Sequence, residues 1–143
     1  MRQTPQTYAV TIVCSERLRL LRPTHQAQTI LATLFRYRTE RRFCLHAFVV
    51  MPDHLHLVLS PAASLEQTVG IIKGGTSFAL RKSYKGPIWD EGYYSHRIRD
   101  ANDFTGQVSY VAANPKRKGW HDYSFVHTCY SEHLDPLPNH LGG

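Results

Sequence analysis

The sequence has few cysteines and no spacing that would pair them. Only Cys14, Cys44 and Cys129 are present, none belongs to a Cys-x-x-Cys motif, and three thiols cannot all be paired within one chain. This usage argues against a fold held by disulfides and favours a reducing compartment. We therefore expect a cytoplasmic protein.

Long apolar stretches, repeats and low-complexity linkers are also lacking. The longest uninterrupted apolar run, Ala47 to Met51, is far too short to span a bilayer, and the polar start from Met1 to Thr7 has no signal-peptide core. At 143 residues and 42% hydrophobic composition, the chain can bury a core of its own. We expect one domain over residues 1–143, with its core from about 8 to 125, a short irregular tail over 126–143 and no membrane partner.

Acidic residues are outnumbered by basic ones. Seventeen Lys plus Arg stand against 11 Asp plus Glu, which gives a formal net charge of +6 and a pI near 9.4. A surplus of this sign favours a partner that carries phosphates, although many basic proteins bind nothing of the kind.

What the sequence does contain is a histidine pair inside a strand-forming run from Phe48 to Ser60. Alternate side chains of a strand share a face, so His54 and His56 point to one side and the leucines that alternate with them point to the other. Two imidazoles at this spacing can converge on one metal ion. The alternative is a chance pair in a chain with nine histidines. His46, on the preceding strand, could join such a site but is more simply explained as structural.

Strands and helices are expected to alternate along the chain. Strands are predicted over 8–14, 44–51, 54–60 and 88–98, with a turn at Pro52-Asp53. One helix should run from a Thr24 cap to about Arg42, and another from a Ser64 cap to about Ala79. This order is that of a ferredoxin-like (βαββαβ) α+β sandwich, an antiparallel sheet with both helices on one face. The opposite face would then be free for a ligand.

Two segments of this fold suit a nucleic acid, and each has a simpler explanation. Gly74-Gly75 interrupts the second helix beside Lys73, so either the helix bends there or another group approaches its backbone closely. Lys73 could contact a phosphate backbone or merely face solvent. From Trp89 to Arg99 aromatic and basic side chains are interleaved, as in proteins that stack single-stranded bases. An aromatic core strand with a charged rim would have the same composition.

A third helix should begin at an Asp100 cap and end near Pro115. Its apolar stripe contains Phe104 and Val108. At 100° per residue, a separate polar stripe is formed by Asp103, Gln107, Tyr110 and Asn114. A phenol and an amide four residues apart can present a nucleophilic hydroxyl next to an oxygen ligand. Three consecutive cations, Lys116 to Lys118, follow in a position suited to a phosphate backbone.

The His54-Leu55-His56 pattern, followed at this distance by Tyr110-Val-Ala-Ala-Asn114-Pro115, resembles the single-tyrosine HUH transposases, and most closely the REP-associated tyrosine transposases. The similarity runs from about Tyr8 to about Phe125. It includes Met51-Pro52-Asp53-His54 and the Trp89 to Arg99 block. Insertion-sequence relatives usually carry Gln where this chain has Asn114, so the departure favours the REP-associated branch.

The resemblance implies a ferredoxin-like sheet with an added C-terminal catalytic helix. It also implies a metal-dependent endonuclease and strand transferase that cleaves single-stranded, hairpin-associated (REP-like) DNA through a 5′-phosphotyrosine. Tyr110 would be the nucleophile, and His54, His56 and Asn114 would hold Mg²⁺ or Mn²⁺. The side chains expected to contact DNA are Lys73, Tyr93, His96, Arg97, Arg99, Lys116, Arg117 and Lys118. Bound to DNA, the protein would be associated with the nucleoid, and both a monomer and a dimer stay open.

Two other functions fit the same pattern. One is a replication or conjugation nickase of the HUH class, which would be accompanied by a helicase or primase domain for which 143 residues leave no room. The other is a non-catalytic nucleic-acid-binding module on the same fold, in which the histidines and the tyrosine are structural. Metal-dependent covalent capture of a labelled oligonucleotide distinguishes the catalytic functions from the binding module.

Overall fold

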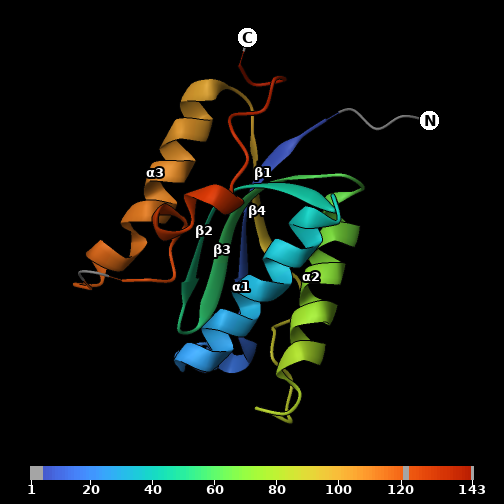
Figure 1. Ribbon diagram of the computed structural model, residues 1–143, viewed down its shortest axis with the longest axis vertical. Coiled ribbons are helices and arrows are strands. Elements are labelled where there is room, and N and C mark those ends of the chain that lie inside the picture. The colour runs from blue at the N-terminus through green and yellow to red at the C-terminus, as the bar shows by residue number, and fades with distance from the viewer. Residues whose placement is uncertain (1–4, 121–122, 143) are drawn as a thin grey trace.

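The computed structural model describes residues 5–120 and 123–142 (Figure 1). The strands are β1 (Thr7–Val13), β2 (Phe43–Met51), β3 (His54–Pro61) and β4 (Tyr94–Ile98); the helices are α1 (Thr24–Thr39), α2 (Leu65–Leu80) and α3 (Ala101–Arg117). Three 3-10 turns complete the set, namely η1 (Ser15–Arg17), η2 (His127–Cys129) and η3 (Ser131–His133). The sheet runs in the order β2-β3-β1-β4 with every pair antiparallel, so the predicted ferredoxin-like fold is confirmed.

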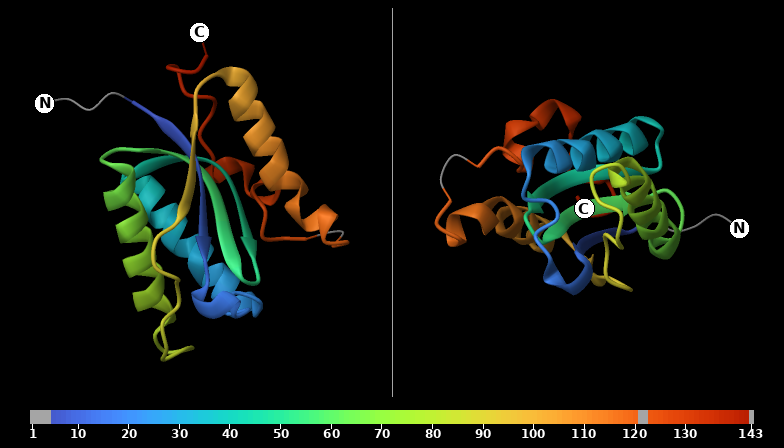
Figure 2. Two further views of the ribbon diagram at one scale, coloured as in Figure 1. Left: turned by 180° about the vertical axis from the view of Figure 1, so that it is seen from behind. Right: turned by 90° about the horizontal axis from the view of Figure 1, so that it is seen from below.

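Both faces of the sheet are covered (Figure 2). Helices α1 and α2 lie together on one face, over the fully buried Leu55, Leu57 and Leu59 of β3. On the opposite face α3 packs against β2 and β3, where a second core gathers around Val58 and Val111. The expectation that this face would be free is therefore wrong for much of its area, because the apolar stripe of α3 needs a surface on which to bury itself.

Helix α1 is shorter than predicted. Its N-cap is Pro23 rather than Thr24, and the cap makes no side-chain hydrogen bond. The helix ends at Thr39 instead of near Arg42. The cause is local, because Arg41 takes a left-handed φ of 61°, a conformation that ends helices.

Helix α2 starts as predicted, with a capping box in which Ser64 and Gln67 each accept from the other's backbone N–H. It continues unbroken through the two glycines, and the ring of Tyr37 lies so close to Gly75 that a side chain there would collide with it. Close approach, not bending, therefore explains that glycine. The inward stripe ends on Leu80, whereas Ala79 is exposed.

The fourth strand is shorter than the predicted 88–98, because only Tyr94–Ile98 pairs regularly with β1. Gly92 turns the chain with a φ of 74°. Before it, Trp89 bridges only to Cys14, and its indole N–H donates to Thr76 Oγ1 of α2 at 2.9 Å. The apolar start of the segment thus packs with the helices instead of extending the sheet.

Helix α3 continues past the expected stop at Pro115 and ends at Arg117. Asp100 caps it as predicted by accepting from the Asp103 N–H at 2.8 Å. Proline in the last turn removes only one intrahelical hydrogen bond. Both Asn114 and Pro115 are buried, and this burial outweighs the local preference to stop. The extra half turn carries Arg117 round to the side of Tyr110.

The C-terminal tail, expected to be irregular, runs along the free edge of β2. The N–H of Val50 donates to Phe125 O at 2.9 Å, and Val126 forms a bridge with Val49. Val126 and Leu141 are buried in the second core, so the packed structure extends beyond residue 125. An unpaired sheet edge is a site for unwanted strand addition, and the tail protects this one.

The three cysteines are free thiols, with Cys14 buried and the other two exposed. Burial raises the pKa of Cys14 to about 12, so this thiol is protonated and unreactive at neutral pH. No helix of residues 5–120 and 123–142 combines the length and the apolar character needed to cross a membrane.

Asp135 anchors the tail. It accepts from Arg38 Nε at 2.9 Å, from Arg38 Nη2 at 3.0 Å and from the Leu45 N–H at 2.8 Å, while its own N–H donates to Leu45 O at 2.7 Å. His46 completes the joint, with Nδ1 3.0 Å from Asp135 O and Nε2 2.8 Å from Ser60 Oγ. His46 is thus held in a structural network away from His54 and His56, as the simpler explanation for it anticipated.

We expect Asp135→Asn to lower the free energy of unfolding at pH 7 by about 1 to 3 kcal/mol, because a bidentate charged partner of a mostly buried Arg38 is lost. Burial alone would raise the pKa of Asp135, but the Arg38 and Leu45 hydrogen bonds outweigh it and lower that pKa below its usual value. The stabilisation is therefore present above the unfolded carboxyl pKa and is lost as the pH falls through the folded one.

Urea unfolding of both proteins at pH 7 and pH 3 measures this, and the difference between their free energies of unfolding should be smaller at pH 3. Glu132→Gln is the matched control, since Glu132 lies in the same tail with a 70% exposed side chain and should change stability by less than about 0.5 kcal/mol. An equal effect of the two substitutions would show that Asp135 does not anchor the tail.

Candidate active site

The two histidines lie on the face of the sheet that α3 covers, and the three leucines of β3 lie on the other, as the alternation predicts. His56 stands in a row across the sheet, opposite Val49 on β2 and Thr11 on β1, and Thr11 is in turn opposite Tyr94 on β4. His54 starts the same strand directly after the Pro52-Asp53 turn. The rigid sheet therefore fixes the direction of both imidazoles.

Asp53 orients His54. Its Oδ1 lies 2.9 Å from His54 Nδ1, and its Oδ2 lies 3.6 Å from an Arg17 guanidinium nitrogen. Burial opposes ionisation of Asp53, but the His54 and Arg17 contacts outweigh it and lower the pKa of the carboxyl. Because an ionised carboxylate only accepts, His54 donates from Nδ1, and its Nε2 lone pair is available to a metal.

His56 is held in the neutral form. Burial is the main cause, the nearby His54 and Arg117 add to it, and together they lower the pKa of His56 to about 4. A neutral imidazole is the form that binds a metal ion, since protonation would occupy the lone pair. The strand thus presents His56 in a state suited to ligation.

Helix α3 brings Tyr110 and Asn114 to the histidines. All four side chains line one hollow of about 350 Å³, together with Thr11, Arg17, Arg117 and Lys118. The rings of Tyr110 and His56 are 5.7 Å apart between centroids. Tyr110 is 51% exposed, whereas Asn114 is 7% exposed. The predicted polar stripe therefore places a reachable phenol and a sheltered amide at the same site.

Positive charge surrounds the phenol. The Arg117 guanidinium carbon lies 3.9 Å from the centroid of the Tyr110 ring, within the range of a cation–π contact. Lys118 follows at the end of α3, and Arg17 reaches the hollow from η1 on the other side. A phosphate group that entered the hollow would meet cations from two separate elements.

The remaining predicted DNA contacts do not all lie at this hollow. Lys73 donates to the backbone carbonyls of Asp90 at 2.7 Å and Gly92 at 2.6 Å, so it secures the loop before β4. His96 Nε2 lies 2.8 Å from Asp103 Oδ2 and ties β4 to the first turn of α3. Tyr93 packs against the helix-side core. Arg97, Arg99 and Lys116 are exposed, as is His96.

The sequence predicts no site role for Thr11 and Arg17, which line the hollow, or for Asp53, which contacts His54 beside it. Asp53 follows a turn proline and directly precedes the histidine pair, and a carboxylate in that place is a common partner for a metal-binding histidine. Arg17 and Thr11 had no such signal, because only the fold of η1 and the register of β1 bring them to β3. Arg17 and its neighbour Glu16 both take left-handed conformations, with φ of 57° and 54°. Such strained positions cluster at functional sites.

The donor set fits a small divalent ion. Within the described residues no three His, Cys, Asp or Glu side chains are arranged to hold a metal, so the set here is two imidazoles and one amide. Mg²⁺ prefers oxygen ligands and keeps several waters, whereas Mn²⁺ accepts imidazole more readily. His54 and His56, with the Asn114 oxygen, would leave coordination positions open for phosphate oxygens.

Comparisons with known proteins bear on this site. The profile of the family described as Transposase IS200 like matches residues 3–114, a range that contains His54, His56, Tyr110 and Asn114. Among curated proteins, the chain is 24% identical over 107 residues to the REP-associated tyrosine transposase of Escherichia coli (strain K12), covering 68% of this chain and 59% of that protein. It is 29% identical over 93 residues to an uncharacterized protein of Haemophilus influenzae, covering 48% and 52%. The chain thus spans a little over half the length of these relatives.

Among solved structures, one of a REP-associated tyrosine transposase bound to a REP hairpin superposes with a TM-score of 0.73 at 24% identity, covering 100% of this chain and 96% of that one. A putative transposase from Deinococcus radiodurans superposes with a TM-score of 0.59 at 20% identity, covering 78% and 92%. These likenesses establish the fold. The profile match, which covers well over half of the chain, shows that the chain belongs to the IS200-like transposase family.

Proposed function

We propose that this protein is a metal-dependent single-stranded DNA endonuclease and strand transferase that acts on hairpin-associated DNA through a 5′-phosphotyrosine. The observation that carries the proposal is the convergence of Tyr110, His54, His56 and Asn114 on one hollow rimmed by cations. A strand and a distant helix thus bring a phenol, two imidazoles and an amide, all suited to metal-assisted phosphoryl transfer, to one place. The relatives named as transposases are consistent with it.

In the proposed reaction the Tyr110 oxygen attacks phosphorus in line with the bond to the 3′ oxygen. A bond forms between tyrosine oxygen and phosphorus, the bond from phosphorus to the 3′ oxygen breaks, and the phenolic proton is released as a 3′-hydroxyl is generated. The phosphodiester energy is conserved in the adduct. A second 3′-hydroxyl can therefore displace the tyrosine and rejoin the strand without a nucleotide cofactor.

The chain's own residues prepare this attack. The sheet and α3 hold the nucleophile and the phosphate site in a fixed relation, which lowers the entropic cost of reaching the in-line geometry. Arg117, Lys118 and Arg17 place positive charge beside the phosphate oxygens. The ion held by His54, His56 and Asn114 would polarise the phosphorus centre and neutralise developing charge.

Substrate shape follows from the same geometry. A phosphodiester must bend into the hollow to meet Tyr110, and a stacked duplex is a stiff rod, so cleavage should require a single-stranded segment. The protein named in the E. coli match and the hairpin-bound structure support a hairpin-forming partner for this chain as well. Arg97, Arg99 and Lys116 are exposed, and we expect them to contact the flanking DNA.

We expect one sequence to be cleaved as a single-stranded hairpin and not as a fully paired duplex with the same metal. Screening a library of single-stranded hairpins by sequencing the cleaved ends would supply the substrate. On that hairpin, Lys116→Ala should lower the salt slope of binding by roughly 0.7 to 0.9 because one phosphate contact is lost. Arg36→Ala on α1, a cation on the helix side, is the control and should leave the slope unchanged. Equal cleavage of hairpin and duplex would contradict the proposed substrate.

A further inference from the structure

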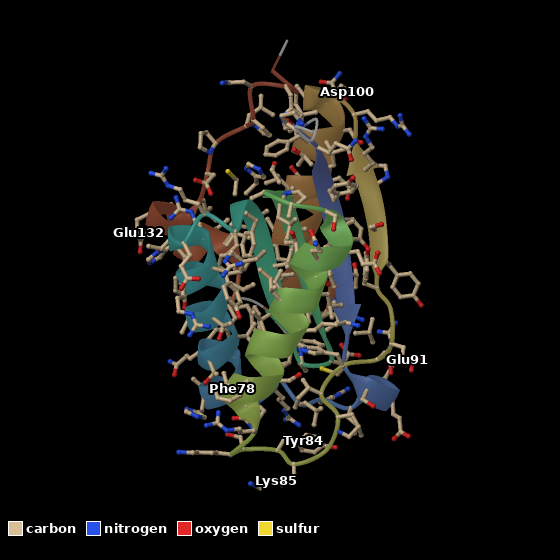
Figure 3. The ribbon with its side chains drawn as sticks, turned by 90° about the vertical axis from the view of Figure 1, so that its right-hand side faces the viewer. Phe78, Tyr84, Lys85, Glu91, Asp100 and Glu132 are labelled. Carbon is tan, nitrogen blue, oxygen red and sulfur yellow. The ribbon has the colours of Figure 1, made fainter. Side chains whose placement is uncertain are left out.

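A second basic and aromatic surface lies at the C-terminal end of α2, outside the hollow described above. It is formed by Phe78, Arg81, Lys82, Tyr84 and Lys85, and we name it the α2-end surface. Figure 3 shows Phe78, Tyr84 and Lys85 gathered at this end of the helix. Four of these residues, without Phe78, line a hollow of about 500 Å³ with Gly86 to Ile88.

The charge of this surface is of one sign. Residues 77–88 contain three cations and no acidic residue, although the whole chain carries a net charge of only +6. All three cations, Arg81, Lys82 and Lys85, are exposed. Half of the net charge of the protein is thus concentrated in twelve residues, a distribution suited to a polyanion.

Phe78 is the unexpected member. It is 66% exposed on the outer side of a helix whose inner side is well packed. The Arg81 guanidinium carbon lies 3.8 Å from the Phe78 ring centroid, and the same guanidinium donates to Phe78 O at 2.6 Å. The ring is therefore held in place by its own cation. An exposed, oriented aromatic ring beside cations suits an unpaired base with its phosphates, whereas a paired duplex offers no free base face.

The border of the α2-end surface is hydrogen-bonded to the segment that leads from β1 to the candidate active site. Ile88, at its border, accepts a hydrogen bond from the Ser15 N–H at 2.8 Å, and the Asp90 N–H donates to Val13 O at 2.9 Å. Ser15 starts η1, the turn whose Arg17 lines the histidine hollow. In Figure 1 and Figure 2 the end of α2 and the turn between β2 and β3 lie at the same end of the molecule. A strand that leaves the hollow past Arg17 would have to follow the end of α2 to reach Phe78.

We infer that the α2-end surface binds the single-stranded DNA that flanks the cleaved phosphodiester, with a base stacked on Phe78 and phosphates on Arg81, Lys82 and Lys85. This inference rests on the proposed function. It adds a second contact for the same strand, on the helix side of the sheet. A duplex stem would be a different occupant, and the test below distinguishes it from a single strand.

The test measures binding without cleavage. Wild-type protein is titrated, in the presence of a metal chelator, into a series of fluorescein-labelled oligothymidylates that increase in length by one nucleotide. The duplex arm uses the longest of these strands paired with oligodeoxyadenylate. Affinity for the single strand should rise once it is long enough to reach Phe78. Phe78→Ala should remove that gain, about five- to tenfold, and Phe78→Tyr should restore it. The triple variant Arg81→Ala, Lys82→Ala, Lys85→Ala should lower the salt slope by about 2.

Photocrosslinking of 5-iodouracil oligonucleotides identifies the contact directly, and the crosslink should map to Phe78 or Tyr84. Arg36→Ala, an exposed cation on α1, is the matched control and should bind as wild type does. Wild-type affinity in the Phe78 and cation variants would overturn the inference. The inference would also be overturned if only the cation variant lost affinity, and lost it for duplex as well as for single-stranded DNA. That result would assign the surface to a duplex stem. None of these binding measurements depends on Tyr110. The proposed function is tested separately, because it would be contradicted by the absence of a covalent adduct on Tyr110.

Discussion

Replacing Tyr110 with Phe should abolish the covalent protein–DNA adduct and reduce cleavage at least about a thousandfold, because only the attacking oxygen is removed. The affinity for single-stranded DNA should change little, since the ring that Arg117 contacts is kept. Incubation of 5′-labelled and 3′-labelled hairpin with Mn²⁺, followed by denaturing gel electrophoresis, measures both adduct and cleavage. The label that stays with the protein also reports which side of the break is captured.

Tyr94 provides the matched control for this experiment. It is 70% exposed and lies in register with Thr11, so among the tyrosines of the sheet it could also approach a bound phosphate. Tyr94→Phe should leave cleavage within about tenfold of wild type, because its ring and not its hydroxyl would contact DNA. An adduct that survives in the Tyr110 variant and disappears in the Tyr94 variant would transfer the nucleophile to β4.

Replacing His56 with Ala should remove metal-supported cleavage while preserving the fold. His56 is a central ligand in the proposed site, and two ligands cannot hold the ion against water as three do. The variant should still unfold cooperatively, because the adjoining leucine face keeps the sheet packed on α1 and α2. A Mn²⁺ titration followed by the shift in melting temperature measures metal binding independently of activity.

Asp53→Ala makes this prediction sharper, since it removes the group that orients His54 and leaves both imidazoles in place. Loss of such a partner typically costs about 10- to 100-fold in metal affinity, so excess Mn²⁺ should rescue this variant and not the His56 variant. If His56→Ala lost its cooperative transition, the histidine would be structural. If both variants bound Mn²⁺ as wild type does, the ion would lie elsewhere.

Much of the site was predictable because it is encoded in short-range periodicity. The alternation at His54 to Leu59 fixes which side chains share a face of a strand, and the spacing from Tyr110 to Asn114 fixes which share a stripe of a helix. The same periodicity, with the order of elements, predicts the ferredoxin-like sheet. Errors in the bounds of the elements fell at Arg42, Pro115 and the start of the fourth strand, where local preference competes with packing. The expectation of a free sheet face was also wrong, because α3 covers much of it.

Other features depended on contacts between distant segments. Arg17 reaches the histidines because η1 follows β1, and β1 pairs with β3 rather than with its neighbour in sequence. In the sequence, Lys73 and His96 resemble the exposed basic residues near them. In the structure Lys73 is hydrogen-bonded to the loop before β4, and His96 is hydrogen-bonded to Asp103 of α3. A charge pattern cannot distinguish a cation that is hydrogen-bonded within the fold from one that faces solvent, because that depends on which acceptors the fold brings near.

The sequence by itself therefore determined the strand and helix faces, the fold class and the identity of the histidine pair, the tyrosine and the asparagine. These follow from side-chain directions that repeat every two or every 3.6 residues. Tertiary structure alone decided that α3 lies across the histidine face and that the tail protects β2. It also decided that Arg17 lines the hollow, that Asp53 orients His54 and that Phe78 is left exposed. Those outcomes depend on the packing of surfaces far apart in the chain, for which no local pattern carries information.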